Sequence, residues 1–321
     1  MLAKMWRITG CIMFALSIPS WSQTYPEKPL RFIVPYTPGG GADILARDVA
    51  RRLSESHGWN VIIDNRPGAG GNLGAEVAAK APPDGYTFLF GHTGPLAVNP
   101  HLYKRMSYDP LKDFSPVILI GSTYNLLVVS PHLPTRSIKD LISLIKRYPN
   151  DMSYASAGVG SGAFLAAELF KNLTGLTILH IPYKGNAPAL LDVLGGRIPL
   201  MFPSIVTAAR HVQSGKLRAL GITTIERSKS MPDVPTISET IPGYEASVWY
   251  GLVAPTQVPH SIIMALNSRI QQVLMPENVK KDMAEQGVVL QAGTADAFAS
   301  FMKSEHEKWG KVVRASGMKI D

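Results

Sequence analysis

A glycine-rich turn near the start of the chain combines residue types that can bind an anion. The turn, Pro38-Gly39-Gly40-Gly41-Ala42-Asp43, follows the apolar run Leu30-Arg-Phe-Ile-Val-Pro35. Glycines after a strand let the backbone come close to a ligand, and the start of the following helix offers unpaired N–H groups and a positive dipole end. We therefore predict an anion site here. The alternative is a tight strand-to-helix turn in which Asp43 only favours the first helical turn.

A second glycine turn, Gly158-Val-Gly-Ser-Gly162, lies about 120 residues further on in the same kind of context. Gly158-x-Gly160-x-x-Ala163 matches the dinucleotide-binding pattern. However, no acidic residue ends a second strand about 20 residues later, where the chain reads His180-Ile-Pro182. A small-anion site, with the hydroxyls of Ser156 and Ser161 available, uses the same geometry.

The serines also leave an enzyme hypothesis open, an exported α/β hydrolase that uses Ser161 or Ser204. Such an enzyme needs a base within hydrogen-bond reach of the serine. The nucleophile elbow Gly-x-Ser-x-Gly would need glycine at positions 159 and 163, where the chain has Val159 and Ala163.

Three further pairs follow strands or lie in extended segments, and each has a structural alternative. His92-Thr93 ends a predicted strand, but a lone histidine is commonly a buried structural residue. Tyr183-Lys184 follows another strand, although lysines are commonly solvated. Trp249-Tyr250 lies in a late extended segment and either lines a cleft or belongs to the core.

The amino-acid composition argues against several classes of function. One cysteine excludes an intramolecular disulfide and Cys-based zinc or iron–sulfur sites, and the eight histidines show no His-x-His or His-x-x-x-His spacing. We therefore expect no metal and no cofactor. The net charge is +8, but the basic residues are scattered singly or in pairs, so we expect no nucleic-acid partner.

The N-terminus predicts export. Lys4 and Arg7 precede the mostly apolar segment Ile8–Pro19, and Ser20-Trp-Ser22 is a small-x-small cleavage site. We expect residues 1–22 to be a signal peptide. Cys11 superficially matches a lipoprotein box, but no apolar stretch precedes it.

The rest of the chain alternates strands with helices, which predicts an α/β fold. Ala42–Ser56 illustrates the helices, because Leu45, Val49 and Leu53 recur every four residues. There are two such blocks, separated by the extended stretch Pro116–Ser130 and followed by the extended segment Ala246–Ala254. We predict two lobes, each a mostly parallel sheet flanked by helices, hinged by two crossover strands. Lobe 1 is 23–124 plus 249–321, and lobe 2, inserted, is 125–248.

Seven motifs occur in order along this framework. They are Tyr25-Pro-x-Lys-Pro29, Val34-Pro-x-x-Pro-Gly-Gly-x-x-Asp43, Asn65-Arg-Pro-Gly-Ala-Gly-Gly71, Pro83-Asp-Gly-Tyr-Thr87, Pro182-Tyr-Lys-Gly185, Gly195-Gly-Arg197 and Pro232-Asp-Val-Pro-Thr236. With these motifs the chain resembles the substrate-binding proteins of tripartite tricarboxylate transporters, the Bug family, over nearly the whole predicted mature sequence.

The resemblance implies a two-lobed periplasmic binding protein of a type II-like architecture, which is not an enzyme. It implies capture of a small organic carboxylate and delivery to a separate membrane permease with a large and a small subunit. Presentation of the loaded protein to a membrane sensor kinase is an alternative output. In the family the carboxylate is held by loops that correspond here to Tyr36–Asp43 and Ser156–Ser161.

The expected ligand-binding residues come from both glycine turns and from the strand ends. They are Tyr36, Gly39, Gly40, Gly41, Asp43, His92, Thr93, Ser156, Gly158, Gly160, Ser161, Tyr183, Lys184, Ser204 and Trp249.

Overall fold

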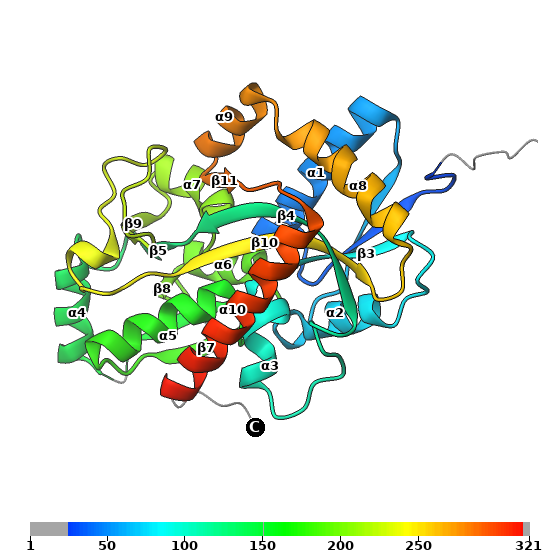
Figure 1. Ribbon diagram of the computed structural model, residues 1–321. Helices are drawn as coiled ribbons and strands as arrows, with labels where there is room; N and C mark the ends of the chain where they lie inside the picture. Colours follow the sequence, from blue (N-terminus) through cyan, green and yellow to red (C-terminus); the bar gives the residue numbers. More distant parts are fainter. Residues whose placement is uncertain (1–24, 150, 317–321) are drawn as a thin grey trace, which may run out of the picture.

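The computed structural model describes residues 25–149 and 151–316 and shows two lobes, each built on its own sheet (Figure 1). The predicted signal peptide, residues 1–22, lies outside the described residues. Among the helices of the described ranges, none combines the length and the apolar character that crossing a membrane requires.

The first lobe carries a six-stranded mixed sheet in the order β11-β4-β10-β3-β1-β2. Its strands are β1 (Leu30–Val34), β2 (Val61–Asn65), β3 (Thr87–His92), β4 (Phe114–Tyr124), β10 (Ser247–Pro255) and β11 (Val288–Leu290). β1 pairs in parallel with β2 and β3, whereas β10 runs antiparallel to β3 and β4.

The second lobe carries a five-stranded sheet in the order β7-β6-β8-β5-β9. Its strands are β5 (Leu126–Val129), β6 (Ser153–Ser156), β7 (Leu179–Pro182), β8 (Leu200–Met201) and β9 (Arg218–Ile222). β6 is parallel to β7 and β8, and β5 is antiparallel to β8 and β9. The parallel pairing predicted from the sequence therefore holds within the βαβ units, and the crossover strands add antiparallel pairs to both sheets.

The chain passes between the lobes at Asn125. The extended stretch predicted at 116–130 is two strands, β4 in the first sheet and β5 in the second, and Asn125 between them bridges to Ser204. The chain returns between β9 and β10. The lobe boundaries at 124/125 and 248/249 remain predictions. β10 pairs with β4 of the first sheet from Ser247 onward, two residues before the second boundary.

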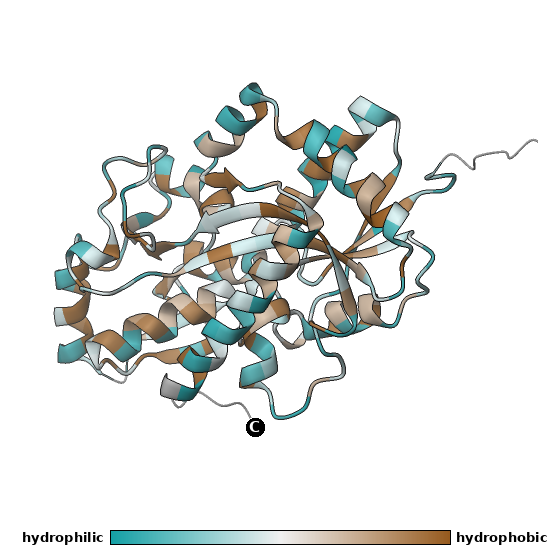
Figure 2. Ribbon diagram, viewed as in Figure 1, coloured by the Kyte–Doolittle hydropathy of each residue, from teal (hydrophilic) through white to brown (hydrophobic). Residues whose placement is uncertain are grey.

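Helices cover the faces of both sheets (Figure 1). They are α1 (Gly41–His57), α2 (Asn72–Ala79), α3 (Asn99–Leu102), α4 (Ile138–Arg147), α5 (Gly162–Thr174), α6 (Asn186–Leu194), α7 (Ile205–Gln213), α8 (His260–Leu274), α9 (Glu277–Glu285) and α10 (Ala295–Ser316), with short 3₁₀ or π turns at Ala69–Gly71, Gly94–Val98 and Ile237–Glu239. The stripe predicted for α1 is buried, since Leu45, Val49 and Leu53 are at most 1% exposed. Figure 2 shows apolar residues along the interior strands and polar residues on the outer faces of the helices.

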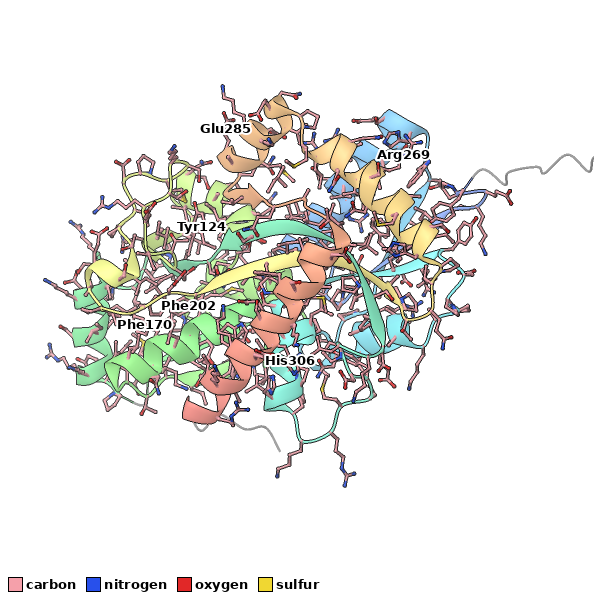
Figure 3. The ribbon with its side chains drawn as sticks, in the orientation of Figure 1. Tyr124, Phe170, Phe202, Arg269, Glu285 and His306 are labelled. Atoms are coloured by element: carbon pink, nitrogen blue, oxygen red, sulfur yellow. The ribbon has the colours of Figure 1, made fainter. Side chains whose placement is uncertain are left out.

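The long C-terminal helix α10 packs against both lobes. It lies across β4 and β10 and reaches toward α5 (Figure 1). Its residue Phe298 packs edge-on against Trp249 of β10 in the first lobe, with ring centroids 5.8 Å apart. Further along, Val313 joins the core of the second lobe, in which Phe170 and Phe202 also pack (Figure 3). The helix α10 therefore contributes to the cores of both lobes.

Candidate functional site

A small cavity lies between the lobes, where turns from both sheets meet. Its lining residues are Tyr36, Gly40, Gly41, Ala42, His92, Asn125, Ala157, Ser161, Gly162, Ala163, Asn186, Ser204, Val248 and Tyr250. The turns after β1 and β6 both contribute, as expected for ligand sites at the carboxyl ends of parallel strands. The centre of a water molecule can move within about 30 Å3 of this cavity.

Four helices begin at the cavity: α1, α5, α6 and α7. The N-caps of three of them, Gly40, Gly185 and Ser204, provide no side-chain hydrogen bond to their helices. The fourth, α5, is capped by Ser161, whose Oγ accepts the N–H of Phe164 at 3.3 Å. Because the first turn of a helix has N–H groups without helical partners, α1, α6 and α7 retain donors that a ligand can use.

These three uncapped helix starts lie next to one another. A methyl group placed on Gly40 would lie 4.0 Å from the backbone nitrogen of Asn186, and one on Gly41 would lie 3.0 Å from Ser204 Oγ. The Ser204 side chain is 2% exposed, and its hydroxyl has no hydrogen-bond partner in the described part of the chain. We call Gly40, Gly41, Asn186 and Ser204 the anion pole. Its residues lie at the start of α1 in the first lobe and at the starts of α6 and α7 in the second lobe.

Asp43 stabilises the glycine turn that carries part of the anion pole. It does not line the cavity; its carboxylate accepts the N–H of Gly39, Nε of Arg47 and Nδ2 of Asn65, each at 2.9 Å. Burial alone would raise the pKa of this carboxyl, but the hydrogen bonds from Arg47, Gly39 and Asn65 outweigh burial and hold the pKa below its usual value. The ionised Asp43 therefore fixes the turn that carries the glycines.

An aromatic wall faces the cavity from the first lobe. The rings of Tyr36 and His92 stack with centroids 4.9 Å apart, and Tyr36 Oη donates to the carbonyl of Gly70 at 2.7 Å. The N–H of Gly94 donates to His92 Nδ1 at 2.9 Å, so the neutral ring carries its proton on Nε2. Burial lowers the pKa of His92 to about 3, which keeps it uncharged near neutral pH.

The cavity has no formal charge on its walls. Among the described residues that line it, none is Asp, Glu, Lys or Arg. The lining polar groups are hydroxyls, side-chain amides, one neutral imidazole and backbone N–H groups, and such groups recognise an anion by dipoles rather than by a countercharge.

The structure brings six of the sequence-predicted site residues to the cavity and leaves nine outside its lining. Those that line it are Tyr36, Gly40, Gly41, His92, Ser161 and Ser204. Those that do not are Gly39, Asp43, Thr93, Ser156, Gly158, Gly160, Tyr183, Lys184 and Trp249.

Two of the nine pack on the opposite side of the first sheet. Thr93 Oγ1 accepts the N–H of Trp249 at 3.0 Å, and Trp249 Nε1 donates to Glu305 at 3.0 Å. Because neighbouring residues of a strand point to opposite faces, Tyr250 faces the cavity instead. Burial raises the pKa of Tyr250, so its hydroxyl keeps its proton.

Three more of the nine lie at a second opening between the lobes. Gly158, Tyr183 and Lys184 line this opening together with Gly70 and Tyr103. Tyr103 Oη donates to the carbonyl of Val159 at 3.2 Å, so the two lobes touch here.

Ser156 and His180 form a hydrogen-bonded pair inside the second lobe. Ser156 Oγ lies 2.7 Å from His180 Nε2 and accepts the N–H of Gly158 at 3.0 Å. The imidazole packs against the rings of Tyr154 and Phe164. Neither member of the pair lines the cavity, so the pair braces the turn that follows β6.

The hydrolase hypothesis lacks a base at the serines it invoked. Ser161 Oγ caps α5, and Ser204 Oγ has no partner. Within residues 25–149 and 151–316, no histidine, lysine or acidic side chain hydrogen-bonds to either hydroxyl. Activation of a serine nucleophile requires such a base.

Eight lining residues were not among the expected ligand-binding residues: Ala42, Asn125, Ala157, Gly162, Ala163, Asn186, Val248 and Tyr250. Asn186 could have been found as the first helical residue after the Tyr183-Lys-Gly185 turn, and Tyr250 from strand alternation beside Trp249. Asn125 carries no sequence signal, because its place depends on where the chain crosses between lobes.

The fold and this site define a two-lobed solute-binding receptor. The chain belongs to the family described as "Tripartite tricarboxylate transporter family receptor", which residues 45–318 match. The family resemblance found in the sequence is thereby confirmed.

Several known proteins are similar over almost their whole length. Protein BugT of Bordetella pertussis is 38% identical over 307 residues, covering 95% of this chain and 94% of that protein. The structure of R. palustris Rpa4515 with adipate is 38% identical, with a TM-score of 0.88 over 91% of this chain and 98% of that one. MatC from Rhodopseudomonas palustris with bound malate is 30% identical, with a TM-score of 0.85 over 90% and 100%.

Proposed function

We propose that this chain is a periplasmic solute-binding protein that captures a small organic carboxylate in the interlobe cavity and delivers it to a membrane permease of the tripartite tricarboxylate type. One observation carries the proposal: three uncapped helix starts from two lobes converge on the anion pole, in a cavity without charged walls. Backbone donors and the positive ends of helix dipoles are suited to a carboxylate.

Hydrogen bonds to the carboxylate provide enough energy for useful binding. A hydrogen bond to a charged group contributes roughly 1.5–3 kcal/mol. Three or four such bonds are enough for micromolar affinity after the entropy costs of association. Because the donors come from both lobes, the carboxylate contacts all of them only when the lobes are closed. Differential affinity of this kind is what drives closure.

Similar proteins support a carboxylate as the ligand and a membrane permease as the partner that receives it. Two similar structures contain adipate and malate, which are both carboxylates. The family description names a transporter receptor, which supports a permease partner. The N-terminal signal predicted at 1–22 supports export to the periplasm.

A thermal-shift screen of the purified protein against a carboxylate panel tests the proposal. A ligand present at 100 times its Kd adds about 2.7 kcal/mol of stability. Each acid is paired with its primary amide, which keeps the shape and removes the charge. Stabilisation by acids alone supports the proposal, and stabilisation by another ligand class with no response to any carboxylate contradicts it.

Delivery to a permease is tested separately in cells. Deleting the gene should abolish uptake of the carboxylate identified in the screen. Normal uptake, with loss of carboxylate-induced gene expression instead, would replace transport by presentation to a sensor kinase.

A further inference from the structure

We propose that the cavity selects a short acid with a single carboxylate, whose other end presents an uncharged acceptor oxygen, a hydroxyl or a ketone, to the Nε2–H of His92. The inference rests on the proposed function and narrows its ligand class. It follows from the number of anion-binding poles, the state of His92 and the size of the closed cavity.

The cavity has one pole for a carboxylate. The uncapped helix starts of α1, α6 and α7 meet at Gly40 and Gly41. The fourth helix start, that of α5, gives one N–H to its cap, Ser161. It adjoins the same pole, because a methyl group on its first residue, Gly162, would lie 3.5 Å from Nδ2 of Asn125, which bridges to Ser204. A second carboxylate at the far end of the cavity would be buried against neutral walls, which is strongly unfavourable without donors or a countercharge.

His92 supplies the donor for the far end of the ligand. Its Nδ1 is occupied by the N–H of Gly94, and its ring is held between Tyr36 and Tyr250, with centroids 4.9 and 5.9 Å away. The side chain is 4% exposed and lines the cavity, and within the described part of the chain no residue accepts a hydrogen bond from Nε2. Because His92 lines the cavity, its Nε2–H can donate to an acceptor on a bound ligand. An uncharged oxygen suits it best, because no cation accompanies it.

The size of the cavity limits the ligand to a few carbons. The free volume of about 30 Å3 for water centres holds about two or three waters. Two or three waters take roughly 60–90 Å3 of liquid, so the cavity has room for an acid of only a few carbons.

The surrounding backbone does not allow the cavity to grow while the lobes stay closed. A methyl group on Gly70 would overlap the carbonyl of Val159 in the other lobe, and one on Gly185 would overlap Thr37. The two lobes are therefore in direct contact around the site.

Calorimetry on the purified protein near neutral pH tests the proposal with lactate, pyruvate, propionate, hexanoate, malonate, succinate and malate. We expect lactate or pyruvate to bind about tenfold or more tighter than each dicarboxylate and hexanoate, and about fivefold tighter than propionate, which lacks the acceptor oxygen. A dicarboxylate or hexanoate that binds as tightly overturns the inference and leaves the proposed function standing. Failure of every carboxylate to bind overturns both.

Variants of His92 test its part in the selection. His92→Phe keeps the ring and removes the donor, so the preference for lactate or pyruvate over propionate should fall about fivefold. His92→Gln, which can place an amide N–H near the same point, should restore part of that preference. His132→Gln, at an exposed histidine, serves as the control. An equal loss for all acids in His92→Phe would make the residue merely structural and overturn its role.

Discussion

A methyl group on Gly41, at the start of α1, would lie 3.0 Å from the hydroxyl oxygen of Ser204, the N-cap of α7 in the other lobe. Two helix starts from separate lobes thus approach each other, and the hydroxyl of Tyr250 lies beside them, 2.9 Å from the same methyl position. An anion placed there contacts both lobes at once, which links ligand binding to closure.

Gly41→Ala should weaken carboxylate binding about tenfold, or about 1.4 kcal/mol. The new methyl would stand 2.9 Å from Tyr250 Oη and 3.0 Å from Ser204 Oγ, so one of these groups must move. Isothermal titration calorimetry measures the effect. Gly293→Ala is the matched control, because its methyl would meet neighbours only at 3.6 Å and beyond. Equal affinities of the two variants would place the carboxylate elsewhere.

Gly70→Ala should also weaken binding, by about tenfold or more, although Gly70 does not line the cavity. Its methyl would overlap the carbonyl of Val159 and keep the lobes apart. Gly70 has a φ of +62°, so the variant also carries backbone strain. Gly58→Ala controls for that strain, because Gly58 has a φ of +67° and no neighbour within 4 Å of the new methyl.

Small-angle scattering of the Gly70→Ala and Gly58→Ala variants distinguishes a failure of the lobes to close from the effect of backbone strain. With ligand, Gly58→Ala should contract as the wild type does, whereas Gly70→Ala should stay expanded. A compact, tightly binding Gly70→Ala protein would mean that the contact with Val159 is not needed in the bound state.

The βαβ units of both lobes could be predicted because their signals are local. The four-residue spacing of Leu45, Val49 and Leu53 specifies the buried face of α1. The two glycine turns could likewise be recognised as strand-to-helix connections. What they do not share is capping, since Ser161 caps α5 while Gly40 leaves α1 uncapped.

The cavity lining depends on choices that a single sequence leaves open. Trp249 and Tyr250 are both buried, at 2% and 4% exposure, and only the arrangement of β10 decides which of them faces the cavity. Asn125 and Asn186 reach the cavity because the second lobe folds over the first. Such contacts between distant segments leave no periodicity in the sequence.

Asp43→Asn should destabilise the protein by about 1–3 kcal/mol, the cost of disturbing hydrogen bonds to a buried charged group. The carboxylate holds Gly39, Arg47 and Asn65 at once, and an amide can accept only part of these bonds. Urea denaturation measures the change. Asp151→Asn, at an exposed position, should shift stability by less than about 0.5 kcal/mol. Wild-type stability of Asp43→Asn would show that the carboxylate does not hold the turn.

Acidification should lower stability before it changes ligand binding. Burial lowers the pKa of His92 to about 3 and that of His180 to about 4, whereas in the unfolded chain both take up a proton near pH 6.5. Between these values the unfolded state binds more protons, so the free energy of unfolding falls as pH drops from about 6.5 toward 4, by up to about 1.4 kcal/mol per pH unit for each histidine. Carboxylate affinity should stay level between about pH 5 and 8, because the cavity gains no charge there.

His180→Gln isolates one part of this pH dependence. The variant removes a titrating group that lies outside the cavity, so its stability should depend less steeply on pH between about 6.5 and 4.5 than that of the wild type. Urea denaturation at a series of pH values gives the slopes, and His132→Gln, at an exposed histidine, should keep the wild-type slope. A His180→Gln slope equal to that of the wild type would mean that His180 takes up its proton in the folded protein as readily as in the unfolded chain. Affinity that rises as the pH falls from about 8 to 5 would mean that His92 becomes a cation within the cavity, contrary to its burial.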